Sequence, residues 1–406
     1  MKLLKVKLGL FLLLPALSLG AMDMGLFVDG TASLESLGSG NENRYAVSGT
    51  LIPWVSSPLL GENALLYASA GLTAAYENKE FTLVPELLRT EFTWFFNNKA
   101  GAELKAGRMQ YSDPLGFIAA GLFDGVSFSM DWGNAEVYAG AWYTGLLYKK
   151  NANITMTGTE LLSYALPLAY DDFFDTYFAP RRMVLALGYE NPTLTELIRL
   201  KLALIAQFDL NGEETQYHSQ YLVGKLSIPL GRFFVGEAGL CFEAAQNAGT
   251  AKLGLAGELG LGYFLPTAIQ DKIALLGRFS SGTVEGAPIG TFTPITTESQ
   301  GKILKAKLSG LSMISLTYTA RLLETLSVTV ENSYFVRSDL ASYQGWPAGK
   351  EGYFLGDELA ASLLWRPLSD LQINLGGGVF LPSLGNVAKN EPARWRIELS
   401  VLLALY

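Results

Sequence analysis

Apolar and polar residues alternate along many segments of about ten residues, and this pattern constrains the fold of the chain more than any other feature. In the segment 326–333 the apolar residues share one parity and the polar residues the other: Leu326, Val328 and Val330 against Ser327, Thr329, Glu331 and Ser333. A side-chain period of two is that of a β-strand. An apolar face opposite a polar face is typical of a strand that separates lipid from a water-filled lumen. A shift by one residue would place charges in lipid, so the pattern specifies the facing of each strand.

A helical membrane protein does not fit the sequence. The mean hydropathy of +0.23 is high for a soluble protein. Past the first twenty residues, however, the chain has no apolar run of the roughly 18 residues that a helix needs to cross a bilayer. The 43 Gly, 19 Tyr and 22 Phe favour strands and tight turns. We therefore predict an all-β fold, a transmembrane antiparallel β-barrel.

Counting the alternating segments predicts about eighteen strands, and counts from sixteen to twenty also fit. The segments are 24–35, 43–54, 63–76, 81–96, 101–109, 122–132, 135–146, 182–190, 196–210, 216–228, 233–245, 251–264, 272–281, 302–321, 326–337, 353–366, 371–381 and 393–406. Their connections alternate between short ones, such as 133–134, and long ones, such as 147–181. Bacterial barrels place short turns in the periplasm and long loops outside. This alternation predicts an outer-membrane barrel of a diderm bacterium with both termini in the periplasm.

The first 21 residues have the pattern of a cleaved signal peptide. Lys2, Lys5 and Lys7 precede an apolar stretch at 8–14, and small residues follow at 18–21. The alternative, an uncleaved anchor helix, conflicts with the short apolar stretch. We therefore expect a signal peptide at 1–21 and a barrel domain at 22–406, with outer-membrane lipid and the barrel-assembly machinery as partners.

Removal of the signal peptide changes the charge of the chain. Cleavage removes three of the 30 lysines and arginines and none of the 38 acids, so the formal charge becomes 27 − 38 = −11. A strongly acidic chain argues against nucleic acid as a partner.

The residues needed for common enzymatic sites are scarce. His218 is the only histidine, and its neighbour Ser219 would point to the opposite face of a strand. Cys241 is the only cysteine, so the chain has no internal disulfide. We expect no enzymatic activity, no cofactor and no metal site.

The predicted lumen face carries charges of both signs. The candidate lumen and selectivity residues are Arg89, Glu91, Glu103, Lys105, Arg199, Lys201, Glu258, Arg278, Arg321, Glu331, Arg337 and Glu358. A wall of neighbouring opposite charges indicates a hydrated, weakly selective pore. Alternatively, these charges form ion pairs with each other only because an unpaired charge in the wall is unfavourable. Both interpretations stay open.

The long connection 147–181 is the candidate constriction loop. It contains three acids, Asp171, Asp172 and Asp175, and ends at Arg181 and Arg182. In porins a long loop commonly folds into the lumen, where its acids face basic residues of the wall and narrow the pore. The alternatives are a solvated external loop and an incidental calcium site built from the three carboxylates.

Arg108 and Asp124 lie on the apolar parity of their segments. A hairpin centred near 115–116 would place them opposite each other, because facing residues of antiparallel strands lie within about 5.5 Å. We expect an ion pair at the external rim. A bulge at Gly107 that turns Arg108 inward is the competing interpretation.

Two stretches resemble alginate-export-type outer-membrane barrels and related porins. Gly107-Arg108, followed by Phe123-Asp124-Gly125-Val126, is similar to their "GRQ … FDGV" hairpin, and 354–359 with 380–382 is similar to their closing strands. Met109, Ala360 and Ser383 depart from the family pattern. The resemblance implies an eighteen-stranded porin-like barrel. It does not imply alginate as the substrate, because the dense basic lining that suits a polyanion is missing.

These observations favour a porin-like channel for the passive diffusion of small hydrophilic solutes. A transporter of hydrophobic compounds is an alternative because 161–178 is rich in apolar residues, although no hatch precedes the first strand. A surface adhesin or structural barrel is a further alternative, in which 147–181 and 282–301 would bind an external partner.

Overall fold

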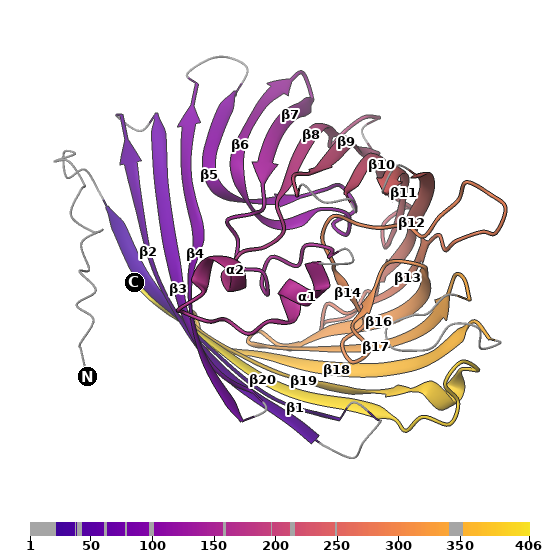
Figure 1. The fold of residues 1–406 in the computed structure, drawn as a ribbon. Coiled ribbons are helices and arrows are strands. Elements are labelled where there is room, and N and C mark those ends of the chain that lie inside the picture. The colour runs from indigo at the N-terminus through magenta and orange to yellow at the C-terminus, as the bar shows by residue number, and fades with distance from the viewer. Residues whose placement is uncertain are drawn as a thin grey trace.

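The computed structural model describes residues 22–36, 38, 43–60, 63–77, 79–96, 101–156, 160–195, 197–211, 216–247, 250–340 and 352–406. In this part of the chain, eighteen strands form one antiparallel sheet (Figure 1). The expected signal peptide, 1–21, lies outside the described residues.

The strands and helices follow one another along the chain with few interruptions. The barrel strands are β1 (Asp23–Ser36), β2 (Asn43–Leu59), β3 (Ala64–Glu77), β4 (Glu80–Phe95), β5 (Glu103–Ser112), β6 (Ala120–Trp132), β7 (Ala135–Tyr143), β8 (Arg182–Asn191), β9 (Arg199–Asp209), β10 (Tyr217–Pro229), β11 (Phe234–Asn247), β12 (Thr250–Phe264), β13 (Lys272–Ser280), β16 (Leu311–Leu323), β17 (Leu326–Arg337), β18 (Phe354–Leu368), β19 (Leu371–Leu381) and β20 (Arg394–Leu405). The connections contain α1 (Glu160–Ala165), α2 (Phe173–Tyr177), β14 (Ser299–Gln300), β15 (Ala306–Lys307) and the 3-10 turn η1 (Pro382–Leu384).

The sheet closes because β1 pairs on one side with β2 and on the other with β20. Asp29, for example, lies opposite Thr50 of β2 and Leu402 of β20. Every other barrel strand pairs with its neighbours in sequence. The prediction of an eighteen-stranded antiparallel barrel is therefore confirmed. Among the described residues, no α-helix is long and apolar enough to cross a bilayer.

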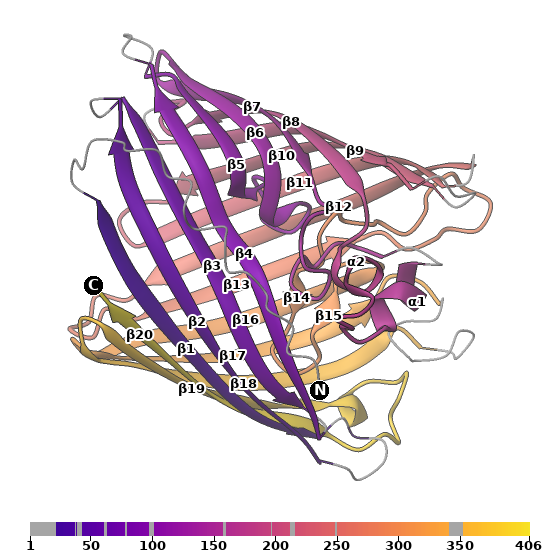
Figure 2. The same cartoon turned by 60° about the vertical axis from the view of Figure 1, so that its left-hand side comes forward.

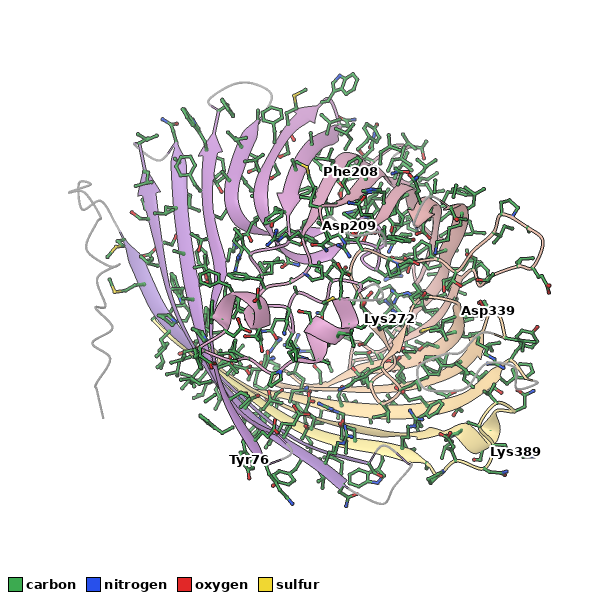
Figure 3. All side chains as sticks on the ribbon, viewed as in Figure 1. Tyr76, Phe208, Asp209, Lys272, Asp339 and Lys389 are labelled. Atoms are coloured by element: carbon green, nitrogen blue, oxygen red, sulfur yellow. The ribbon has the colours of Figure 1, made fainter. Side chains whose placement is uncertain are left out.

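The two faces of the strands follow the predicted parity. Phe208 is 38% exposed on the outer face, whereas its neighbour Asp209 is buried on the inner side (Figure 3). Exposed aromatic residues gather near both ends of the strands, among them Tyr45, Tyr76 and Phe81 at the end with the long connections, and Trp94, Trp132 and Trp365 at the other. Such girdles flank the apolar band of outer-membrane barrels.

Long and short connections lie at opposite ends of the barrel, as the sequence predicts. The connections 113–119, 144–181, 281–310, 338–353 and 382–393 share one end. Turns such as 133–134, 324–325 and 369–370 share the other, where β1 begins and β20 ends. Figure 1 and Figure 2 show α1, α2 and β14 inside the ring of strands, so long connections fold back into the lumen.

One predicted strand boundary is wrong. The segment 302–321 was expected to be one strand, but β16 begins only at Leu311, and 302–310 belongs to an infolded connection. Its alternating residues Leu304, Ala306 and Leu308 are all buried and pack within the lumen. The alternation therefore arises because one side of this segment is buried against the inside of the wall. The segment is not itself a strand of the wall.

The facing of the strands gives a stability prediction. Leu375 on β19 is 47% exposed on the outer face, opposite Leu363 and Leu399. Leu375→Arg should lower the free energy of unfolding by about 2–4 kcal/mol, the effect of a basic residue near the bilayer midplane. The inward-facing Asn374→Arg is the control and should cost much less. Denaturant unfolding in lipid vesicles measures both variants, and equal losses would contradict the assigned facing.

Candidate functional site

One arc of the lumen is filled by three infolded connections. Residues of 113–119, 144–181 and 281–310 form a single apolar cluster with the inward faces of β5 to β12. The loop residues include Leu115, Phe117, Ile118, Phe292, Ile295 and Leu308, and the wall residues include Met109, Phe123, Trp142, Val184, Ile205, Tyr221, Val223 and Cys241. This arc is a packed core and leaves little room for water.

Backbone hydrogen bonds join the connection 113–119 to the connection 281–310. Ile295 and Thr296 both donate their N–H groups to the carbonyl of Ile118, at 2.8 and 3.0 Å. The carboxylate of Asp113 accepts four N–H groups, from Leu115, Gly116, Ile118 and Ala119. Burial raises the pKa of the Asp113 carboxyl, and these hydrogen bonds act in the opposite direction. Asp113 thus organises the short loop that the longer one packs against.

Predicted lumen charges on the packed side hold the connection 281–310 in place. Glu358 on β18 is 2% exposed, and its carboxylate accepts the N–H groups of Lys302, Ile303 and Leu304 at 2.6, 3.1 and 2.8 Å. Arg278 contacts Glu258 at 3.2 Å. Arg278 also donates to the side chain of Gln300 at 2.8 Å. Glu258, Arg278 and Glu358 face inward as expected, but their partners are loop groups as well as wall charges.

Arg337 has a similar position at the end of β17. Its side chain is 1% exposed, and its Nε donates to the carbonyl of Gly352 at 2.8 Å. Arg337 therefore anchors the end of the connection 338–353 and does not face open water.

The candidate constriction loop enters the lumen, but different acids from those expected bind its arginine. Arg182 is 1% exposed and contacts Glu160 of α1 and Asp209 of β9, each at 2.7 Å. Asp171, Asp172 and Asp175 are exposed and form no ion pair with Arg182. The sequence analysis missed Glu160, because its position becomes significant only when α1 folds back over β9. Within the described residues, no group of three His, Cys, Asp or Glu side chains could hold a metal ion.

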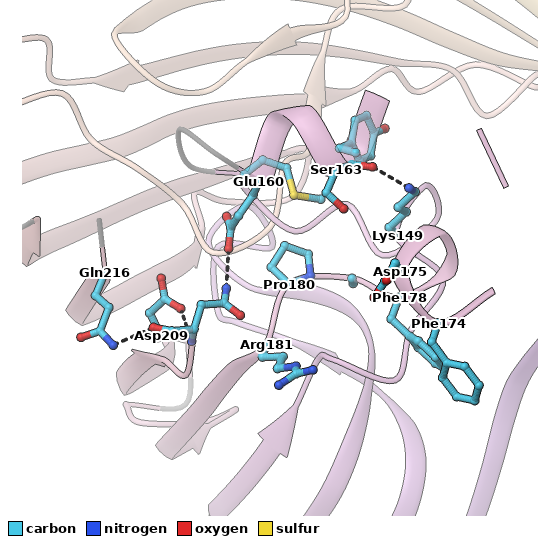
Figure 4. Close-up of a pocket in the computed structure, with 14 residues that line it drawn as sticks. Lys149, Glu160, Ser163, Phe174, Asp175, Phe178, Pro180, Arg181, Asp209 and Gln216 are labelled. Atoms are coloured by element: carbon cyan, nitrogen blue, oxygen red, sulfur yellow. Dashed lines mark hydrogen bonds between the residues drawn. The ribbon is translucent and has the colours of Figure 1, made fainter. Parts of the chain in front are cut away.

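A pocket of about 240 Å³ lies beneath α1 and α2 (Figure 4). Its lining combines aromatic and charged side chains, including Phe174, Phe178, Lys149, Asp175 and Arg181. Lys149 donates to the carbonyl of Ser163 at 2.6 Å, and Asn211 donates to Glu160 at 2.8 Å. The structure thus brings Asp175 and Arg181 to one pocket, whereas Asp171 and Asp172 do not line it.

The opposite arc of the wall keeps several charges in contact with solvent. Arg89 lies 3.0 Å from Glu91, and the Arg89 side chain is 48% exposed, whereas that of Glu91 is 6% exposed. Lys105 lies 2.6 Å from Glu103, and both side chains are at least a quarter exposed. A further cluster joins Arg396 of β20 to Glu35 of β1 and to Glu398.

The remaining candidates lie near the short-turn end of the barrel or form hydrogen bonds with side chains of the same or a neighbouring strand. Lys201 pairs with Glu190 at 2.8 Å, and the exposed Arg199 lines a shallow depression beside it. Arg321 donates to the carbonyl of Glu324 in a turn. Glu331 accepts the hydroxyls of Ser315 and Ser333. The mixed charges are therefore mostly paired or hydrogen-bonded, and few of them face water alone.

Arg108 and Asp124 lie directly opposite each other on β5 and β6. The guanidinium contacts both carboxylate oxygens at 2.8 Å and also donates to the carbonyl of Leu146 at 3.0 Å. The side chain is 4% exposed although it stands on the outer parity. Gly107 has a φ of +118° but causes no shift of register with β4 or β6, so the ion pair replaces the proposed bulge.

The anchoring role of Glu358 can be tested. Glu358→Ala would leave three N–H groups without their acceptor, including that of the buried Leu304, and an unsatisfied buried group costs about 1–3 kcal/mol. Hydrogen exchange should therefore accelerate in 302–308. The adjacent Asp357→Ala is the control, because Asp357 accepts only from Asn332 on the outer parity. Unchanged protection of 302–308 in the Glu358 variant would contradict the anchor.

No protein-family model and no curated protein matches this chain. Solved structures of Pseudomonas aeruginosa outer-membrane barrels do match. OccK5 (OpdH) aligns with a TM-score of 0.63 and 12% identity over 95% of this chain and 98% of its own. OprD aligns with 0.61 and 13% over 95% of each chain. OccK2 (OpdF), solved in complex with glucuronate, aligns with 0.62 and 15% over 95% and 98%. The resemblance to alginate-export-type barrels gains no support from these comparisons. The chain has the fold of OprD and Occ porins, at identities that establish the fold alone.

Proposed function

We propose that this chain is an outer-membrane channel for the passive diffusion of small hydrophilic solutes. The observation that carries the proposal is the division of the lumen. Apolar loop cores cover most of the inner faces of β5 to β12. The inner faces of β1 to β3 and of β20, together with the Arg89 and Lys105 positions of β4 and β5, keep partly solvent-exposed Thr, Ser and charged side chains. A polar strip of wall that no loop core covers provides a path for hydrated solutes.

Paired charges along this strip favour weak selectivity. Arg89 forms an ion pair with Glu91, Lys105 forms one with Glu103, and Arg396 contacts two carboxylates. Neighbouring opposite charges largely cancel each other's field beyond the Debye length of about 8 Å at physiological salt. The bound glucuronate of OccK2, a small hydrophilic molecule, supports this size class of solute for the fold.

The orientation follows the general rule for such barrels. We place the short turns and both termini in the periplasm and the long connections outside, in the outer membrane of a diderm bacterium. In this proposal a signal peptide at 1–21 directs export, the barrel-assembly machinery inserts the chain, and outer-membrane lipid surrounds it. An enzymatic role receives no support from His218, which faces outward and accepts the N–H of Asp209.

Single-channel recording in a planar bilayer tests the proposal. The refolded protein should give steady, ohmic conductance, and a salt gradient should give a small reversal potential. Arg89→Gln removes a positive charge from the polar strip and should shift the reversal potential toward cation selectivity. Lys389→Gln makes the same change of charge in the exposed outer connection 382–393 (Figure 3) and should leave it unchanged. Repeated insertions without conductance would refute the channel.

A further inference from the structure

The half of β4 next to the long connections lacks a hydrogen-bonded neighbouring strand on the side of β5. We call this unpaired edge the seam. The β4–β5 ladder runs only from Thr90 to Phe95. Beyond Arg108, β5 pairs with β6 alone, and Met109 and Tyr111 of this hairpin are buried in the lumen core. Among the described residues, 80–87 of β4 therefore pair with β3 only. Pro85, which has no N–H group, lies in this stretch, as is typical of strand edges.

Side chains occupy the carbonyls of this edge. The hydroxyl of Tyr177 donates to the carbonyl of Pro85 at 2.9 Å, and the hydroxyl of Tyr170 donates to that of Leu83. Arg108 donates to the carbonyl of Leu87 at 2.5 Å. A strand edge at membrane depth needs partners for its polar groups. Here three side-chain hydrogen bonds replace the ladder of a neighbouring strand.

Tyr177 belongs to a small structure that we name the panel, residues 146–151 and 173–179, and Tyr170 lies just before its second segment. Its two segments are joined by the N–H of Lys149 to the carbonyl of Tyr177 and by the N–H of Ala179 to the carbonyl of Leu147, both at 2.9 Å. Tyr148 and Tyr177 pack against Val84 of β4. Figure 1 and Figure 2 both show α2 near the half of β4 that begins at Glu80.

The unpaired part of β4 carries apolar side chains on the outer face of the barrel. Phe81, Leu83 and Leu87 on the unpaired part of β4 are 67%, 39% and 48% exposed on that face. On the panel, Leu146 is 52% exposed, and Phe174, which is 80% exposed, lines the pocket. The exposed apolar residues of β4 place the seam at the depth of the lipid leaflet on the long-connection side.

The pocket of Figure 4 lies directly behind the panel. Lys149, Phe174 and Phe178 belong to both the panel and the lining of the pocket. Arg181 and Asp175 supply charge to the lining, and the two phenylalanines supply an apolar surface. A lining with one aromatic part and one charged part matches a molecule with an alkyl chain and a polar head.

We propose that the panel is a lateral door, through which single-chain amphiphiles pass between the outer leaflet and the pocket beneath α1 and α2. Opening breaks the bonds from Tyr170 and Tyr177 to β4 and leaves the β1–β20 closure intact. The alkyl chain lies against Phe174 and Phe178, and the polar head lies near Arg181. This route is separate from the polar strip of the channel.

A reversible tether across the seam tests the door. Asn151 of the panel donates to Glu86 of β4 at 2.6 Å, so cysteines at these two positions are within reach of a short bis-methanethiosulfonate. Cys241 is fully buried and should not react. The probe is a diazirine-bearing hexadecanoic acid supplied in phospholipid vesicles that contain the protein. Mass spectrometry then locates the photolabel.

The untethered Glu86→Cys/Asn151→Cys protein should carry label on pocket residues such as Phe178 and Arg181. Tethering should abolish that label, reduction should restore it, and label on the lipid-facing Leu185 and Leu187 should not change. Single-channel conductance should survive the tether, which separates failure of the door from failure of the channel. Pocket label that persists under the tether, or that never forms, overturns the proposal.

A second variant tests, without cross-linking, whether the hydrogen bond from Tyr177 to β4 keeps the door closed. Tyr177→Phe removes one hydroxyl from the β4 edge and keeps the packed ring, so pocket labelling should increase. Tyr334→Phe removes an equivalent bond, from Tyr334 to the carbonyl of Leu384, at a distant site and serves as the control. Equal labelling in both variants would show that the hydrogen bond from Tyr177 to the β4 edge does not keep the door closed.

Discussion

The need to satisfy every backbone N–H and C=O group at membrane depth governs this structure. Pairing of β1 with β20 meets that need around most of the wall, because it leaves no open edge where the chain begins and ends. The exception is the half of β4 next to the long connections. There the β5–β6 hairpin turns into the lumen, and Arg108, Tyr170 and Tyr177 supply the missing donors. The seam beside β4 is thus a direct consequence of filling the lumen with that hairpin.

Buried charges connect the wall to the connections that fold inside it. Glu358 binds three loop N–H groups, Arg182 binds Glu160 and Asp209, and Arg337 binds the end of a connection. A buried charge is costly unless it is paired and hydrogen-bonded, and these partners meet that requirement. The inward-facing charges therefore fall into two groups. Buried ones position loops, whereas partly exposed pairs such as Lys105 and Glu103 line the polar strip.

Strand positions were predictable because lipid on one face imposes a period of two on local sequence. The same signal misled at 302–310, since Leu304, Ala306 and Leu308 alternate against a buried loop core and not against lipid. The pair of Arg108 and Asp124 followed from hairpin register, which is also local. Glu160 as the partner of Arg182, the pocket and the seam depend on contacts between distant segments, and no period in the sequence records those contacts.

The central claim is that one arc of the lumen is open and the other is packed. Block of single-channel current by a cationic methanethiosulfonate tests it most directly. Thr50 faces inward on the polar strip, whereas the native Cys241 faces inward within the loop core and is fully buried. The account predicts that Thr50→Cys makes the current sensitive to the reagent and that the unmodified protein is insensitive. Block of the unmodified protein, or no block of the Thr50 variant, would contradict it.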